Sequence, residues 1–320
     1  QELANNWNGA TLSVQRSGPA QAEDSFSLID DQPALPSLGV ETSGANVIVH
    51  GVTVGSFTNS GGKLTVTFNG NATAASVGAV MGAVGYRNTS DAPPASAQIN
   101  FTLNDQNSNV TGGGTAGSGQ NQGALGQLSA QASITVAIAQ VNDAPGIGGL
   151  DAISANTYTE NGPAIQIDSN ATLTDPELDA ADWRGATLTV ARAGGASSDD
   201  IFGATGALSL TGSGSGNVVL SGLTVGTYTQ SGGQLQITFN SNASAARADQ
   251  VMQGLSYRNS SEDPPATVTL AYIVDDQNTG APGTIAQGSG GKLSASGSTV
   301  IAIARVNDAP VVSPAPPAAA

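Results

Sequence analysis

The sequence predicts an all-β protein made of two β-sandwiches in tandem, each with one short helix. A duplication is the first observation behind this: Gly55–Asn69 returns as Gly226–Asn240, and Tyr86–Pro94 returns as Tyr257–Pro265, with few changes. Short β-branched segments separated by Gly, Asn, Ser and Pro are the second, and they are typical of a sandwich. A chain that repeats a whole domain is usually an array, built for reach or valency rather than for one active site.

Five segments in each copy have the composition of strands. In the first copy they are Thr11–Val14, Val47–Val49, Lys63–Phe68, Gln98–Leu103 and Ile134–Val141. In the second copy they are Thr187–Val190, Val218–Leu220, Gln234–Phe239, Val268–Val274 and Thr299–Val306. Ser60–Gly62 and Ser231–Gly233 each lie between two strands, so we expect hairpin turns there.

One segment in each copy breaks the strand pattern. Asn242–Leu255 places Val251, Met252 and Leu255 at helical spacing behind an Asn that can cap a helix. Residues 71–84 are its equivalent in the first copy. The pattern predicts a short helix that crosses one end of each sandwich.

The duplication also predicts the domain boundaries. Residues 1–145 form the first repeat, 146–310 the second, and 311–320 a Pro/Ala-rich tail or the start of a next repeat. The first repeat has no counterpart of Gly146–Pro176, which contains at least one strand. We therefore expect the first repeat to be incomplete by itself, with an apolar groove that invites strand addition.

Composition excludes several classes of function. The 320 residues carry 24 acidic and 9 basic side chains, a net charge of −15, which disfavours nucleic acid as a partner. No apolar run reaches the length of a membrane span, so we expect no membrane insertion. One histidine and no cysteine leave nucleophilic hydrolase chemistry without a base, and we expect no enzyme activity.

A carboxylate-pair glycosidase stays open on the sequence alone, as does a glycan-binding or hydrolase-associated secreted module. Such sites usually line their clefts with aromatic side chains. Trp7 and Trp183 are the only tryptophans, and they align between the repeats. We therefore predict that both pack in a core or at an edge rather than bind sugar.

Acidic and amide side chains gather where strands end. They are Asn142, Asp143, Asp175, Glu177, Asp276, Asn307 and Asp308, with Asp179 and Asp182 close by. Oxygen ligands on loops, without His or Cys, suit a hard cation such as calcium. The alternative is ordinary turn chemistry, because Asp and Asn side chains bond to nearby backbone in turns.

Several motifs resemble those of cadherin and bacterial cadherin-like repeats. The linker motif Val-Asn-Asp-Ala-Pro occurs at Val141–Pro145 and at Val306–Pro310. Thr159–Gly162, Leu173–Glu177 and Gly185–Val190 fit the same family. The helix followed by Tyr-Arg-Asn is similar to repeats of large bacterial surface adhesins. The resemblance covers nearly all of the second repeat and most of the first.

The resemblance implies an Ig/cadherin-like sandwich with calcium bound between consecutive repeats. One implied ligand set consists of Asn142, Asp143, Asp175, Glu177 and Asp276. The other consists of Glu160, Asn307 and Asp308. The chain departs from the family in three ways: Asp-Pro-Glu replaces Asp-x-Asp, the linker is short, and the Leu-Asp-Arg-Glu motif has no counterpart.

The function implied is a non-catalytic extracellular module, structural or adhesive, stiffened by calcium. We expect it at the cell surface or secreted, in a bacterial surface adhesin, a biofilm matrix protein or a filament. Expected partners are neighbouring repeats or copies of the chain itself, and a cell-surface or matrix component. Head-to-tail addition of a strand to the first repeat would give an open filament.

Overall fold

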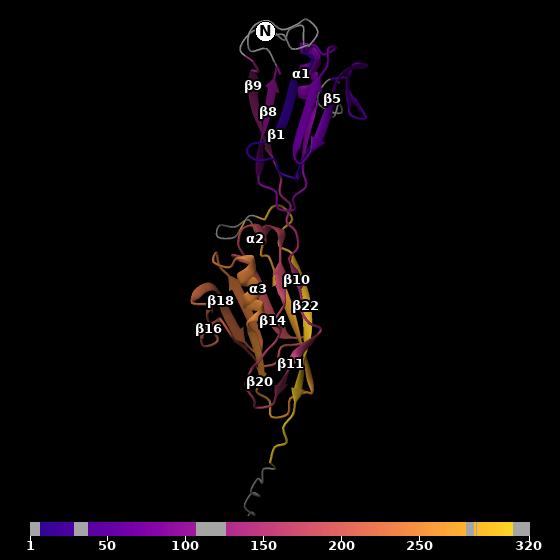
Figure 1. Cartoon of the computed structure of the whole chain (residues 1–320). Helices are drawn as coiled ribbons and strands as arrows, with labels where there is room; N and C mark the ends of the chain where they lie inside the picture. Colours follow the sequence, from indigo (N-terminus) through magenta and orange to yellow (C-terminus); the bar gives the residue numbers. More distant parts are fainter. Residues whose placement is uncertain (1–6, 29–37, 107–125, 280–284, 286, 310–320) are drawn as a thin grey trace, which may run out of the picture. The chain divides into compact units, whose positions relative to one another are not determined.

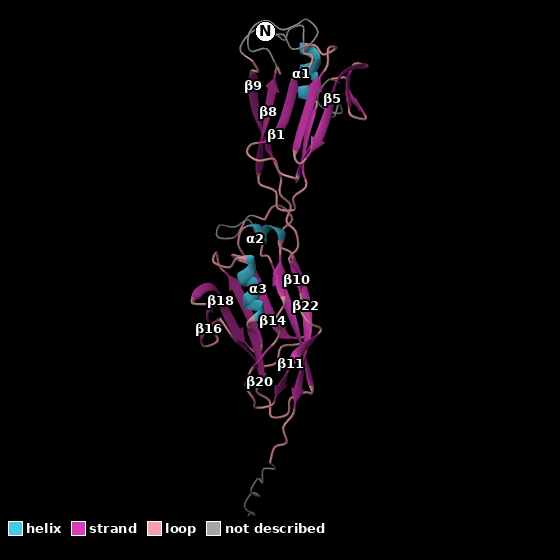
Figure 2. Cartoon of the chain, in the orientation of Figure 1, coloured by secondary structure: helices cyan, strands magenta, loops and turns pink. Residues whose placement is uncertain are grey.

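The computed structural model describes residues 7–28, 38–106, 126–279, 285 and 287–309. The chain separates into two compact units, unit 1 (Gln1–Ala139) and unit 2 (Gln140–Ala320). Both are built mainly of strands, with a few short helices (Figures 1 and 2). The predicted all-β sandwich class is therefore confirmed. Among the described residues, no helix is long and apolar enough to cross a membrane.

Unit 1 packs a seven-stranded sheet against a two-stranded one. The large sheet has the order β3 (Val40–Ser43), β4 (Asn46–Val49), β5 (Val52–Ser60), β6 (Lys63–Phe68), β1 (Thr11–Arg16), β8 (Ser96–Asn104) and β9 (Ser129–Ala137). The small sheet pairs β2 (Asp24–Leu28) with β7 (Val84–Asn88), and α1 (Ala74–Gly82) precedes β7. Trp7 packs edge-on against Phe68 in the core, with ring centroids 6.3 Å apart.

Unit 2 repeats this architecture and adds to it. Its large sheet has the order β11 (Ile153–Thr159), β22 (Ser294–Ala304), β21 (Thr267–Asp275), β14 (Thr187–Arg192), β19 (Gln234–Phe239), β18 (Leu223–Ser231), β17 (Ser215–Leu220) and β16 (Leu208–Gly212). A second sheet has the order β12 (Ile165–Gln166), β20 (Leu255–Asn259) and β15 (Asp200–Ala204). A third pairs β10 (Gly146–Gly148) with β13 (Thr172–Thr174). The helices are α2 (Pro176–Ala180) and α3 (Ala245–Gln253).

The alternating burial of the strands explains the sandwich. In β19 every second side chain is buried, and these include Leu235, Ile237 and Phe239. Trp183 is fully buried and packs edge-on against Phe239 at 6.0 Å between centroids. The prediction that both tryptophans are packing residues is confirmed, because Trp7 is only 9% exposed.

Local chemistry accounts for the turns and helices, with one correction. Gly232 and Gly233 have φ of +58° and +80°, the two positive values of a tight hairpin turn, as predicted. The predicted helix forms in both units, but Asn242 does not cap α3. Ser244 occupies the cap position, and the Asn242 side chain instead donates to the carbonyl oxygen of Thr224 at 2.9 Å. The helix thus begins later, because Asn242 serves the preceding turn.

A buried polar network ties the two sheets of each unit together. In unit 2, Asp200 accepts hydrogen bonds from Tyr257 Oη at 2.7 Å and Asn259 Nδ2 at 2.9 Å. Arg192 holds the same carboxylate through two contacts of 2.7 and 2.8 Å. Both Asp200 and Tyr257 are at most 1% exposed. The repeated Tyr-Arg-Asn motif is therefore structural in unit 2.

Unit 1 contains a looser version of the network. Asp24 accepts from Tyr86 Oη at 2.6 Å and from Asn88 Nδ2 at 2.8 Å. Its arginine partner, Arg16, lies 3.9 Å away, against 2.7 Å for the pair in unit 2. The ionic part of the network is therefore weaker in unit 1.

Asp200→Asn should lower the free energy of unfolding of unit 2 by about 3 kcal/mol, because it leaves a partly buried guanidinium without its counter-charge. Urea denaturation followed by tryptophan fluorescence measures the loss. Asp263→Asn is the matched control, since its ion pair with Arg305 is exposed and should contribute little. Equal effects of the two substitutions would contradict the role assigned to the network.

Candidate metal centres

Unit 2 contains two groups of acidic side chains near opposite ends of β22. Leu293, just before the strand, donates its backbone N–H to Asp276, and Val306, just after it, donates to Glu160. The strand has 11 residues, so the two groups are about 35 Å apart at the usual rise per residue. We call them the α2 cluster (Asn142, Asp143, Asp175, Glu177 and Asp276) and the β11 cluster (Glu160, Glu262 and Asp308).

The local sequence of α2 orients two members of the α2 cluster. Asp175 is the N-cap residue, and its Oδ1 accepts from the backbone N–H groups of Glu177 at 3.1 Å and Leu178 at 2.9 Å. Pro176 follows at the first helical position, which suits its fixed φ. The cap leaves Asp175 Oδ2 without a hydrogen-bond partner. The sequence predicts a loop here, but the structure has a helix, and the cap of this helix orients the Asp175 carboxylate.

Backbone and amide contacts bring the other members of the α2 cluster together. Asn142 Nδ2 donates to Asp276 Oδ2 at 2.7 Å and to the carbonyl oxygen of Gly291 at 3.0 Å. The backbone N–H of Asp143 donates to Glu177 Oε2 at 3.3 Å. The structure thus places all five predicted residues of this set at one end of unit 2.

Four of the five residues of the α2 cluster are buried, and Asp143 is partly buried. Asp175 and Asp276 are each 1% exposed, and Asn142 and Glu177 are each 5% exposed. No salt bridge in the described part of the chain reaches its four carboxylates. Burial, reinforced by the charges of Glu177 and Asp276 and opposed by the cap hydrogen bonds, raises the pKa of Asp175 to about 7. Burial also raises the pKa of Glu177.

Three oxygen atoms of the α2 cluster are buried without any hydrogen-bond partner: Asn142 Oδ1, Asp175 Oδ2 and Glu177 Oε1. Leaving such a group unpaired costs roughly 1–3 kcal/mol, and more for a charged one. A hard divalent cation accepts carboxylate and amide oxygens of this kind. The chemistry of these oxygens therefore suits such an ion, whereas the described acids that have three carboxylate oxygens within 4.8 Å of one another are Glu160, Glu262 and Asp308.

Gln287 lies beside the α2 cluster and was missed in the sequence. Its Nε2 donates to the carbonyl oxygen of Asp276 at 3.1 Å, while its Oε1 is buried without a partner. A Gln-Gly pair also occurs at the corresponding place of the first repeat, at Gln122. That repetition was the only available signal, and Gln122 lies outside the described residues.

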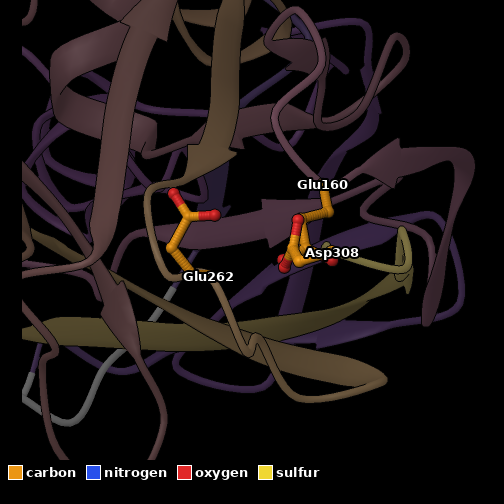
Figure 3. A group of neighbouring side chains, drawn as sticks. All are labelled: Glu160, Glu262 and Asp308. Atoms are coloured by element: carbon orange, nitrogen blue, oxygen red, sulfur yellow. The ribbon is translucent and has the colours of Figure 1, made fainter. Parts of the chain in front are cut away.

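The β11 cluster joins Glu160 and Asp308 with a third acid, Glu262 (Figure 3). One carboxylate oxygen from each of the three lies within 4.8 Å of the others. Glu160 Oε2 accepts from the backbone N–H of Val306 at 2.8 Å, and Oε1 is buried without a partner. Glu160 is 3% exposed, whereas Glu262 and Asp308 are exposed.

Two differences from the sequence reading concern the β11 cluster. Glu262 was not predicted, although an acid also occupies its counterpart, Asp91, in the first repeat. Asn307 was predicted as a ligand, and the structure places it at an exposed position next to Asp308. Glu262 comes from the loop after β20, and the sequence alone does not show that this loop lies beside the end of β22.

Two further acids near the α2 cluster, Asp179 in α2 and Asp182 after it, have both carboxylate oxygens in contact with protein donors. Asp179 accepts from Trp183 Nε1 at 2.9 Å and from the backbone N–H of Asp175 at 3.1 Å. Asp182 forms a two-point pair with Arg184, with Nε–Oδ1 at 2.9 Å and Nη2–Oδ2 at 2.6 Å. Both oxygens of each carboxylate are therefore used by the protein.

Three surface hollows of the described part of the chain do not favour the glycan or hydrolase alternative. They are lined mainly by Gly, Ser, Ala, Leu, Val and Gln residues. None of these three contains an Asp, a Glu or a Trp. They offer neither the carboxylate pair of a glycosidase nor a tryptophan platform.

Comparisons with known proteins assign no family. No protein-family model matches the chain, and no curated protein matches it in sequence. Among solved structures, the crystal structure of a collagen adhesin from S. aureus aligns over 93% of this chain and 86% of its own, with 11% identity. The TM-score of that alignment is 0.15, which supports no statement on fold or function.

Asp175→Asn should stabilise the protein when divalent cations are removed. The substitution deletes one of four crowded carboxylate charges but keeps an oxygen that can cap α2. We expect the free energy of unfolding in EDTA at pH 8 to rise by about 1–3 kcal/mol, since each unit of a raised pKa corresponds to about 1.4 kcal/mol. Urea denaturation measures it, with Asp199→Asn as the control outside the cluster. A loss of stability equal to that of a disrupted cap would contradict this account of the charges.

Proposed function

We propose that the chain is a non-catalytic extracellular module, structural or adhesive, whose second repeat is stiffened by calcium. The resemblance to cadherin-like repeats suggests a bacterial surface adhesin, a biofilm matrix protein or a filament as its setting. The duplicated sandwich, the acidic cysteine-free composition and the lack of a described catalytic constellation support a mechanical role. Its proposed partners are neighbouring repeats and a cell-surface or matrix component.

One observation carries the calcium proposal: three buried oxygens without partners belong to a cluster whose four carboxylates form no salt bridge with any described basic residue. Calcium prefers six to eight oxygen ligands, and carboxylates and amide carbonyls are the usual ones in proteins. Asn142, Asp175 and Glu177 would supply the oxygens, and Gln287, which donates to the Asp276 carbonyl, has a further buried oxygen without a partner. Asp143 and Asp276 contribute charge and hold the others in place.

The mechanical consequence follows from where these residues lie along the chain. Asn142 and Asp143 belong to the segment that enters unit 2, while Asp175 and Glu177 belong to α2. One long hydrogen bond of 3.3 Å joins this entry segment to α2, while Asn142 also bonds to Ser289 and Asp276 elsewhere in unit 2. Ligation of Asn142 together with Asp175 and Glu177 would add a second connection between the entry segment and α2 and reduce its freedom.

Calcium should bind the full chain, raise its melting temperature and make it less flexible in solution. A ligand at 100 times its Kd adds about 2.7 kcal/mol to the stability of the state that binds it. Isothermal titration calorimetry, thermal unfolding and small-angle X-ray scattering with calcium or EGTA measure the three effects. Absence of both binding and stabilisation would overturn the proposal.

A double substitution, Asp175→Asn with Glu177→Gln, separates ligation from a general charge effect. It should remove the part of the stabilisation by calcium that the α2 cluster contributes, while leaving the protein folded, because both side chains keep their shape. Asp199→Asn has the same charge change as one of these substitutions and should retain the full calcium response. If the double variant responds to calcium like the native chain, the α2 cluster is not the site. The β11 cluster is tested in the same way with Glu160→Gln.

A further inference from the structure

The last two long strands of each unit correspond residue by residue. In unit 1, β8 and β9 pair from Ser96↔Ala137 to Asn104↔Ser129. In unit 2, β21 and β22 pair from Thr267↔Ala302 to Asp275↔Ser294, in the same register. The two strand pairs can therefore be compared position by position.

The two final strands differ in what lies on their other side. In unit 2, β22 is flanked by β21 and by β11, which runs parallel to it with Tyr158 opposite Ile303. Two backbone bonds anchor this ladder, from Val300 N–H to the Ala152 carbonyl at 3.0 Å and from Glu160 N–H to the Ala304 carbonyl at 2.9 Å. In unit 1, β9 ends the sheet, with no strand beyond it among the described residues.

The opposite sheet shows the same gap. In unit 2, β20 lies between β15 and β12, and Ile167 donates its N–H to the Leu255 carbonyl at 3.1 Å. Tyr158 also reaches across from β11, where its Oη donates to the Asn259 carbonyl at 2.8 Å. In unit 1, β7 pairs only with β2 among the described strands. Both edges that the 146–178 segment covers in unit 2 thus have no partner strand among the described residues of unit 1.

Burial of equivalent side chains shows what the missing cover leaves exposed. Tyr257, Tyr272, Val274 and Ile301 of unit 2 are each at most 1% exposed. Their counterparts Tyr86, Phe101, Leu103 and Val136 are only partly buried. Ile134 is 57% exposed, whereas its counterpart Thr299 is fully buried. Unit 1 therefore has an apolar face that its own described residues do not cover.

The sequence of β9 lacks the features that usually protect an edge strand. Exposed edges are normally short, or carry charges, prolines or bulges that prevent pairing with other chains. Residues Ser129–Ala137 read SAQASITVA, with no charge and no proline, and pair with β8 without a register shift. At the opposite edge of the same sheet, β3 has four residues and includes Glu41. A nine-residue edge strand without charges, prolines or bulges, such as β9, is suited to strand addition.

We propose that the open face of unit 1 docks an extended polypeptide segment of the kind that Ile153–Ile167 forms in unit 2. This segment comes from a further repeat of the same type. Its first strand runs parallel to β9, with the residue equivalent to Tyr158 opposite Ile138. That tyrosine packs on Tyr86, as Tyr158 packs on Tyr257 in unit 2 with centroids 6.0 Å apart.

The helices indicate which part of the segment matters. In unit 2, Asp249 of α3 accepts from the Leu173 N–H at 2.7 Å, and Gln253 donates to the Ala171 carbonyl at 3.0 Å. The corresponding residues of α1 are Gly78 and Gly82, which have no side chain to offer. The part of the segment that follows Asp168 therefore contributes little on unit 1, and the strand part before it supplies the docking.

A synthetic peptide with the sequence of residues 150–168 tests the proposal on the full chain. Amide hydrogen exchange should slow in β9 and β7. At a peptide concentration 100 times its Kd, the slowing should be about 100-fold for amides that exchange only from the peptide-free protein. A peptide with the sequence of residues 169–180 should have no effect. The substitution Tyr158→Asp within the active peptide should abolish binding, because it puts a charge onto the apolar face.

Variants of the protein complete the test. Ile134→Lys should weaken peptide binding at least tenfold without unfolding unit 1, because the side chain is already exposed there. Ile273→Lys is the matched control, since Ile273 is 47% exposed on β21 of unit 2. Equal binding to both variants would overturn the proposal.

Two other segments could cover the open face of unit 1, and each would give a different experimental result. Slow exchange of all β9 amides in the free chain would mean that other residues of the same chain cover the face. Concentration-dependent dimers that Ile134→Lys removes, measured by sedimentation velocity, would mean that a second copy pairs there directly. Either result would overturn the proposal.

Discussion

Closure of the sandwich by residues 146–178 is the constraint on which the rest of unit 2 depends. This segment supplies β10, β11, β12 and β13, and its strands bury the apolar side chains that face them from β20 and β22. The same segment carries acids of both clusters: Glu160 follows β11, and Asp175 begins α2. The covering segment therefore supplies one acid of the β11 cluster and, through α2, two acids of the α2 cluster. Unit 1 has neither cover nor counterpart of these acids among its described residues.

Closing the sandwich also creates an electrostatic cost that the chain does not offset itself. Four carboxylates come together at one end of unit 2, and the sequence has only 9 basic residues against 24 acidic ones. The partly buried Arg192 is used elsewhere, in the network with Asp200. Desolvation disfavours charge on Asp175 and Glu177, as the raised pKa values of both show. A divalent cation is the simplest way to keep these groups charged and buried.

Much of the fold could be predicted from the sequence, because the repeats and the alternation of apolar residues report local structure and burial directly. The five strands predicted in each copy, the glycine turn at Gly232 and the buried tryptophans follow from such local rules, whereas the other strands, such as β2 and β5, were not predicted. Contacts that depend on distant segments could not be predicted. Glu262 joins Glu160 only because the loop after β20 meets the end of β22, and Asn242 bonds to Thr224 in a turn instead of capping α3.

The hydrogen bonding of the two oxygens of each carboxylate distinguishes the candidate ligands from the other acids nearby. Asp175, Glu177 and Glu160 each use one carboxylate oxygen to accept backbone N–H groups and leave the other buried and unpaired. Asp179 and Asp182 have both oxygens engaged by neighbouring side chains or backbone. Composition and spacing are alike in the two groups, so only three-dimensional hydrogen bonding distinguishes them. An acid that is oriented by the backbone through one oxygen, with the other free and out of water, is already arranged for a cation.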